Sequence, residues 1–157
     1  MKRTAILLAA IATLLIAPLA QAGEGESAVH WTDMSWEQVL ATAKQDNKHI
    51  VIDFFTTWCG PCKRMDKDTY MDTDVAAFMN ANIPVKYDAE KGVGEELAGK
   101  YRIIAYPTTL VIAPDGTVID RHLGYLPPED FLEVIEGYTR GEGTLAWYQK
   151  QVQQDPD

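Results

Sequence analysis

Two cysteines, Cys59 and Cys62, are the residues of this sequence whose type and spacing could do chemistry, and the chain has no others. The first would lie at the start of a helix, where unpaired N–H groups and the helix dipole favour a thiolate. Pro61 suits the first turn of that helix because proline has no N–H to leave unpaired. The second cysteine would lie one turn inward, near enough to attack a mixed disulfide. The spacing therefore predicts a redox dithiol in which Cys59 attacks and Cys62 resolves.

A zinc site and a structural disulfide are the other interpretations of this pair. Zinc needs a tetrahedral set of ligands. The histidines that could complete it are not paired at ligand spacing: His30, His49 and His122. A structural disulfide between such close cysteines would close a very small loop and restrict the unfolded chain little. We therefore favour the redox interpretation and predict no metal site.

The elements next to the dithiol are a strand before it and a helix after it. Residues 49–56 are a continuous run of β-branched and aromatic residues, typical of a strand covered on both faces. Asp53 is the only acid inside that run. After the second cysteine the composition turns helical through residue 63 to about residue 70. The dithiol is thus expected at a strand-to-helix junction.

Caps, turn residues and hydrophobic periodicity predict the remaining elements. Ser35 begins a Ser-x-x-Gln capping box, and Pro114-Asp115-Gly116 is a turn that would join two strands. The predicted elements are helices over 36–45, from a cap at Thr73 to about 79, over 94–100 and from Pro128 to near Gly141, and strands over 83–88, 108–113 and 117–122. This order predicts an α/β fold with a mixed central sheet, a βαβ half followed by a ββα half, and helices on both faces.

The first residues have the pattern of a secretory signal. Lys2 and Arg3 precede an apolar run over 5–17, and Ala20-Gln21-Ala22 offers a cleavage site after Ala22. We therefore expect a signal peptide over 1–22, a disordered leader over 23–30, one domain over 31–141 and an extension over 142–157 that could hold a helix. An exported protein of this kind would lie in the periplasm.

Composition excludes several classes of partner. The formal charge is -9, and 46% of the residues are hydrophobic, which suits one domain with its own core. Nucleic acids and anionic membrane surfaces need a cationic footprint that this chain lacks. We therefore predict no binding to nucleic acid.

Longer motifs around the dithiol resemble thioredoxin. They are Trp58-Cys59-Gly60-Pro61-Cys62-Lys63, the preceding Asp53 and the later Tyr106-Pro107-Thr108, and the likeness runs over about 31–141. Residues 101–125 are more similar to exported thioredoxin-like proteins and to the C-terminal domain of the transmembrane disulfide-reductase electron transporter. The resemblance implies a thioredoxin fold, a cis peptide bond before Pro107 and thiol–disulfide exchange as the activity.

The resemblance also implies roles for individual side chains. Asp53 would be the buried proton acceptor behind Cys62, and Lys86 would pair with Asp53. The residues implied on the substrate-binding surface are Trp58, Gly60, Pro61, Tyr106 and Pro107. Among these, Trp58 would shield the dithiol and Pro107 would dock a peptide.

Together these observations predict an exported thiol:disulfide oxidoreductase that reduces protein disulfides. No nicotinamide or flavin motif is present, so we expect no cofactor and an electron supply from a membrane electron-donor protein. The expected substrates are oxidised exported proteins, and the expected state is a monomer. Two alternatives stay open: a module that uses the dithiol for soft metals such as copper or for non-catalytic binding, and a disulfide oxidant or isomerase.

Overall fold

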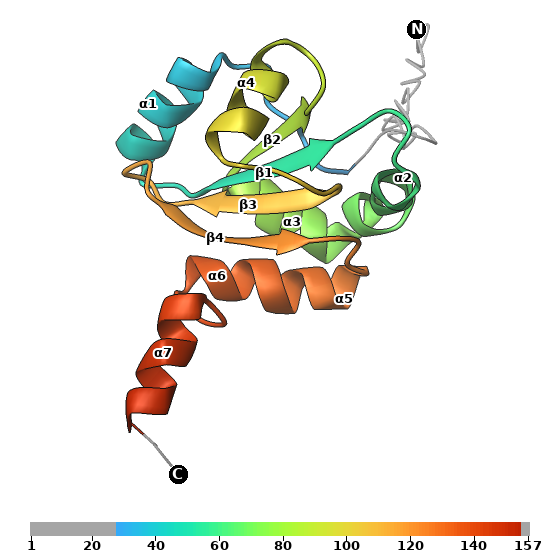
Figure 1. Ribbon diagram of the computed structural model, residues 1–157. Helices are drawn as coiled ribbons and strands as arrows, with labels where there is room; N and C mark the ends of the chain where they lie inside the picture. The colour runs from blue at the N-terminus through green and yellow to red at the C-terminus, as the bar shows by residue number, and fades with distance from the viewer. Residues whose placement is uncertain (1–27, 155–157) are drawn as a thin grey trace, which may run out of the picture.

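The computed structural model describes residues 28–154, so the predicted signal peptide and residues 23–27 of the predicted leader lie outside the described residues. In this part of the chain one four-stranded sheet has the order β2-β1-β3-β4 (Figure 1). Its strands are β1 (Ile50–Phe55), β2 (Ile83–Asp88), β3 (Thr108–Ile112) and β4 (Val118–Leu123). The first two strands are parallel, and β3 is antiparallel to both β1 and β4. The predicted mixed sheet, with a βαβ half and a ββα half, is confirmed.

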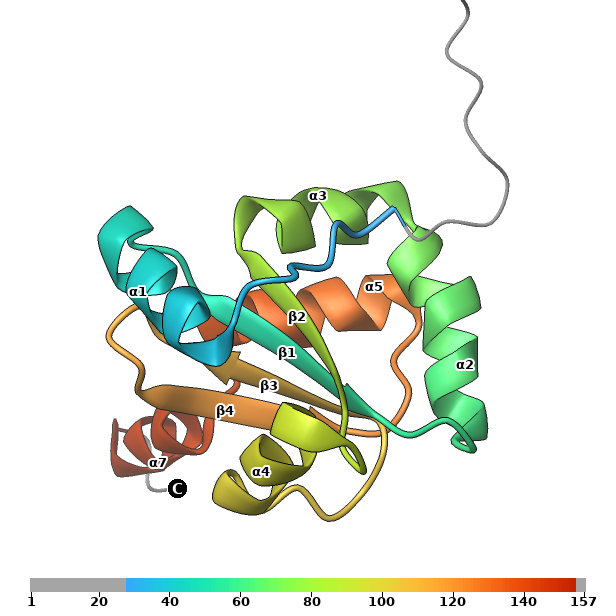
Figure 2. The same ribbon diagram turned by 90° about the horizontal axis from the view of Figure 1, so that it is seen from above.

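Alternation along β1 divides the core into two layers. Ile50, Ile52 and Phe54 belong to a buried cluster that includes residues of α1 (Trp36–Asp46) and α4 (Gly92–Lys100). Val51, between them, belongs to a second cluster with residues of α3 (Thr73–Ala81) and of the closing helix. Figure 2 shows these helices on opposite sides of the sheet. Because side chains alternate between the faces of a strand, Asp53 falls on the same face as Val51.

Side-chain caps mark the starts of α1 and α3. The predicted capping box of α1 is confirmed, since the Ser35 hydroxyl accepts from the Gln38 backbone N–H and the Gln38 side chain accepts from Ser35 N–H. The predicted cap at Thr73 is wrong. Asp72 caps α3 instead, because its carboxylate accepts from two backbone N–H groups of the first turn at 2.9 and 3.0 Å.

The helix after β2 begins two residues earlier than predicted, at Gly92 rather than Gly94. A Cβ added at Gly94 would lie 2.1 Å from the carbonyl oxygen of Asp88, so only glycine lets the helix pass this close to the end of the strand. The packing of the start of α4 against the end of β2 therefore depends on glycine at position 94.

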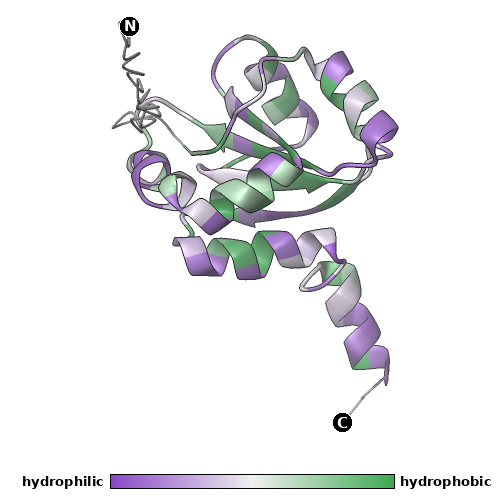
Figure 3. Ribbon diagram, turned by 180° about the vertical axis from the view of Figure 1, so that it is seen from behind, coloured by the Kyte–Doolittle hydropathy of each residue, from purple (hydrophilic) through white to green (hydrophobic). Residues whose placement is uncertain are grey.

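The predicted closing helix is confirmed but contains an irregular turn. It consists of α5 (Pro128–Phe131), a π-helical turn η2 (Leu132–Glu136) and α6 (Gly137–Thr139). A further helix, α7 (Leu145–Gln154), lies in the predicted extension over 142–157 and projects from the body of the molecule (Figure 1). It has no buried residue, and Figure 3 shows it mostly in hydrophilic colours. Within residues 28–154, every helix is too short or too polar to span a bilayer.

The prediction of a disordered leader as far as residue 30 is wrong for residues 28–30. Val29 is 2% exposed and packs in the second core cluster. The Asn80 side chain accepts from His30 N–H at 2.8 Å and donates to the carbonyl of Ala28 at 3.1 Å. The domain therefore begins before Trp31, because burial of one apolar side chain and two hydrogen bonds from α3 hold the segment in place.

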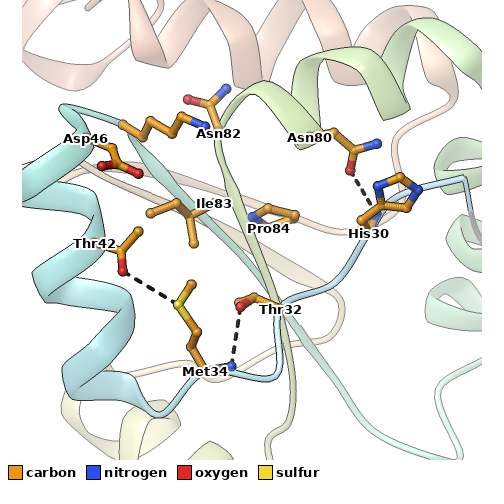
Figure 4. A pocket seen from close by; sticks show the side chains of 10 residues that line it. His30, Thr32, Met34, Thr42, Asp46, Asn80, Asn82, Ile83 and Pro84 are labelled. Atoms are coloured by element: carbon orange, nitrogen blue, oxygen red, sulfur yellow. Dashed lines mark hydrogen bonds between the residues drawn. The ribbon is translucent and has the colours of Figure 1, made fainter.

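A surface hollow of about 240 Å³ lies where this segment passes the start of β2 (Figure 4). Its walls include His30, Asn80 and Pro84. The hollow is at the amino end of β2, whereas the dithiol follows the carboxyl end of the parallel strand β1. It is therefore separate from the redox pair.

Candidate active site

Cys59 and Cys62 form a disulfide at the start of α2 (Gly60–Lys67), with their Cα atoms 5.3 Å apart. Cys59 is the N-cap of the helix, and its sulfur accepts from the backbone N–H of Cys62 at 3.1 Å. Pro61 lies in the first turn, as predicted, and both Gly60 and Pro61 are exposed. After reduction, the same N–H would face a thiolate on Cys59. The structure thus confirms the predicted position of the pair at a helix start.

Asp53 lies buried in β1, with 1% of its surface exposed. The alternation of the strand turns it toward the layer that contains Met65 of α2 and Tyr70 of the following turn, η1 (Thr69–Met71). The predicted burial is therefore confirmed. Its role as a proton acceptor stays a prediction.

Lys86 is the cation next to Asp53, as the resemblance implied. The two residues are register partners on β1 and β2, and Lys86 Nζ lies 3.5 Å from Asp53 Oδ2. The same ammonium group also pairs with Asp66 of α2, whose side chain is 45% exposed. Asp66 therefore links the buried pair to the surface.

Burial and charge compete at Asp53. Burial disfavours the carboxylate and raises the pKa of Asp53 from 3.8 to about 6. The positive charge of Lys86 lowers this pKa, and the negative charge of Asp66 raises it. Near neutral pH the group is then mostly ionised yet close enough to its pKa to take up a proton.

Trp58, directly before the dithiol, is 66% exposed and held from two sides. Its indole N–H donates to both carboxylate oxygens of Glu90 at 3.1 Å. Its ring meets that of Tyr106 edge to face, with the centroids 6.0 Å apart. Two predicted surface residues are therefore in contact, and the shielding of the dithiol by Trp58 stays a prediction.

The Tyr106–Pro107 peptide bond is cis, as the resemblance implied. Pro107 is buried directly before β3, and its carbonyl accepts from Gly124 N–H at 2.8 Å. The Thr108 hydroxyl donates to the carbonyl of Ala105 at 2.8 Å. The loop is thus tied to both strands of the hairpin, and its predicted contact with substrate is untested.

Two acidic residues of this site, Asp66 and Glu90, were not predicted from the sequence. Asp66 comes one turn after Cys62, and Glu90 follows β2, the strand parallel to β1. Helical spacing and the shared carboxyl edge of parallel strands are the signals that could have indicated them. Among residues 28–154, no group of three or more His, Cys, Asp or Glu side chains is placed to hold a metal ion.

Comparisons with known proteins agree with this geometry. The family model described as a thioredoxin-like domain matches residues 36–139. The chain is 30% identical to a thioredoxin of Mycoplasmoides gallisepticum, over 64% of this chain and 90% of that protein. It is also 30% identical to the thiol:disulfide interchange protein DsbD of Vibrio vulnificus, over 64% of this chain but only 18% of that longer protein.

A solved structure adds a match in three dimensions. The solution structure of a candidate disulphide-isomerase from Bacteroides thetaiotaomicron superposes with a TM-score of 0.66 at 36% sequence identity. The match covers 76% of this chain and 99% of that one. The part of this chain that follows the matched family region includes α7.

Proposed function

Because the chain belongs to the thioredoxin-like family and is a thiol:disulfide oxidoreductase with Cys59 and Cys62 as its redox pair, we propose that it reduces the disulfides of exported proteins. The observation that carries this proposal is the dithiol at a helix start, together with a buried, mostly ionised acid on the sheet face against which Met65 of the same helix packs. The export, the electron donor and the direction of electron flow are parts of the proposal.

The reaction begins at Cys59. Its thiolate attacks one sulfur of the substrate disulfide, so that a bond forms between Cys59 and that sulfur while the substrate S–S bond breaks. The other substrate sulfur leaves as a thiolate and takes up a proton from water. The N–H of Cys62, which already faces the Cys59 sulfur at 3.1 Å, favours the thiolate that starts this step.

Cys62 completes the exchange. The Asp53 carboxylate accepts the proton of the Cys62 thiol, and the resulting thiolate attacks the Cys59 sulfur. The Cys59–substrate bond breaks, the second substrate sulfur leaves as a thiolate, and the Cys59–Cys62 disulfide seen in the structure forms. Two electrons have passed from the dithiol to the substrate, so a donor protein must reduce the chain before the next cycle.

The direction of electron flow is proposed from the two residues between the cysteines. Gly60-Pro61 is the thioredoxin pair, and thioredoxin has a reduction potential of roughly -270 mV, against roughly -120 mV for the strong periplasmic oxidant. No histidine lies between the cysteines to stabilise the Cys59 thiolate further. Equilibration with glutathione buffers should therefore give a value near the thioredoxin end. A value above about -170 mV would make the chain an oxidant and end the reductant proposal.

Export is proposed from the pattern of residues 1–22. Expression of the whole chain in a Gram-negative host should give a periplasmic protein whose first residue is Gly23. Mass spectrometry of the intact protein from the periplasmic fraction measures this directly. A full-length chain that stays in the cytoplasmic fraction would contradict the proposed location and leave the redox chemistry unaffected.

A further inference from the structure

Tyr70 is a buried phenol that belongs to no motif of the redox pair. It lies in η1, directly after α2, and none of its surface is exposed. Trp31 and Phe131 pack edge to face on its ring, with centroids 4.9 and 5.9 Å away. A phenylalanine ring would fill the same space, and burying a hydroxyl costs free energy unless the hydroxyl makes a hydrogen bond. The hydroxyl therefore calls for an explanation that packing does not supply.

The groups that face Tyr70 come from every element packed around it. On β1 the neighbour is Asp53, and on β3 it is Thr109, the register partner of Asp53. On β2 it is Lys86, whose Nζ lies 5.2 Å from the centre of the Tyr70 ring and 3.5 Å from Asp53 Oδ2. On α2 it is Asp66, the second partner of Lys86. Asp53 and Tyr70 thus lie beside the same ammonium group, that of Lys86.

We propose that Tyr70 is a positioning residue for the exchange reaction: its hydroxyl donates a hydrogen bond to the Asp53 carboxylate and keeps that carboxylate ready to accept the proton of Cys62. The inference deepens the proposed function and rests on the role of Asp53 as the proton acceptor. A donor is needed because Asp53 is buried and the Lys86 ammonium is shared with Asp66.

The electrostatics of the cluster support this assignment of donor and acceptor. Burial, and next the charge of Asp53, raise the pKa of Tyr70 well above 10, so the phenol keeps its proton wherever the enzyme works. A hydrogen bond donated by Tyr70 would lower the pKa of Asp53 against the larger effect of burial. The phenol is therefore a permanent donor, and Asp53 is the group whose protonation it adjusts.

Tyr70→Phe tests the inference, because it keeps the ring and removes only the hydroxyl. The carboxyl carbon of Asp53 is titrated by NMR in the reduced, full mature chain. We expect its midpoint to rise by about half to one pH unit. The rate of the Cys62 step, followed as release of the second substrate thiol, should then fall several-fold near pH 6 and match wild type near pH 9. An unchanged midpoint and pH profile would overturn the inference.

Two further variants separate the possible failures. Tyr138→Phe removes a phenol from another part of the same core cluster and should leave the midpoint and the profile unchanged. Asp53→Asn should abolish the acidic limb, and adding Tyr70→Phe to it should cause no further slowing. If Asp53→Asn left the pH profile of the Cys62 step unchanged, Asp53 would not be the proton acceptor. The NMR midpoint of Asp53 in Tyr70→Phe would still show whether Tyr70 acts on Asp53. A chain that reduced no protein disulfide would refute the proposed function but not the effect of Tyr70 on Asp53.

Discussion

At the residue scale, Asp53 shows how the site trades stability for reactivity. Its side chain is buried in a strand, close to one shared ammonium group. Burial raises its pKa to about 6, which suits proton transfer near neutral pH. The same burial makes the carboxylate unfavourable in the folded state, so the properties that serve the reaction cost folding free energy.

Asp53→Asn should raise the free energy of unfolding of the oxidised protein at neutral pH by about 2–3 kcal/mol, because burial raises the pKa of Asp53 from 3.8 to about 6. Between pH 3.8 and about 6 the folded chain holds a proton at Asp53 that the unfolded chain has released. The stability of the wild type therefore falls as pH rises through this window, and Asp53→Asn should remove that fall. Urea denaturation across the window measures both effects. A variant less stable than wild type at neutral pH would refute the expectation.

Lys86 and Asp66 should move the titration of Asp53 in opposite directions. Lys86→Met removes the cation that lowers the pKa of Asp53, and Asp66→Asn removes an anion that raises it. NMR titration should show the midpoint of Asp53 rising in the first variant and falling in the second, each by about one unit or less. Lys63→Met, at an exposed position of α2, is the matched control and should leave it unchanged. Shifts of the same sign would contradict the electrostatic account.

At the scale of elements, the junction of β1 and α2 assigns the two sulfurs different roles. Cys59 is the N-cap, and Cys62 lies within the first turn. In the disulfide form both are buried, at 3% and 2% exposure, so exposure does not distinguish them. Their positions in the helix do distinguish them, because the free N–H groups at the helix start stabilise negative charge on the sulfur of the N-cap, Cys59.

Iodoacetamide at neutral pH should therefore alkylate Cys59 of the reduced protein before Cys62. Peptide mass spectrometry at short reaction times measures the two rates separately. Cys62→Ser should leave the rate at Cys59 within a few-fold of wild type, which controls for oxidation of the pair. Faster modification of Cys62 would reverse the assignment of attacking and resolving cysteines.

At the scale of the whole molecule, the two ends of the described chain are held differently. Residues 28–30 bury Val29 in the core and bond to Asn80, so they are part of the folded unit. The last helix, α7, is tied at its start, where Asp120 accepts from Leu145 N–H at 3.1 Å. None of its side chains is fully buried, and Trp147 is half-buried.

Changes at the two ends should therefore differ in cost. Val29→Ala should lower the free energy of unfolding by about 1–2 kcal/mol, because two buried methyl groups are lost. Removal of residues 145–157 should change it by less than about 1 kcal/mol, because α7 contains no fully buried residue. Urea denaturation of the two variants compares them. A larger loss from the truncation than from Val29→Ala would show that α7 is part of the core.

The sequence alone determined the elements and the chemistry of the redox pair. A capping box, a turn tripeptide and an apolar run around Asp53 are local signals, and local signals specify helices, turns and buried strands directly. The motif Cys59-Gly60-Pro61-Cys62 also specifies its own geometry, because a helix start and a spacing of one turn need no distant residue. The buried acid and the position of the dithiol were predictable for this reason, and the mixed sheet was predictable from the order of the elements.

Only the tertiary structure decided which distant groups complete the site. Asp66, Tyr70 and Glu90 come from α2, η1 and the loop after β2. The first two meet Lys86, and the third meets Trp58, only once the parallel pairing of β1 with β2 and the packing of the helices are fixed. The packing of Val29 is a similar case, since its burial depends on a face of the core built from α3 and the closing helix. Such contacts depend on the register between segments far apart in the chain, and no short-range pattern of residues carries that information.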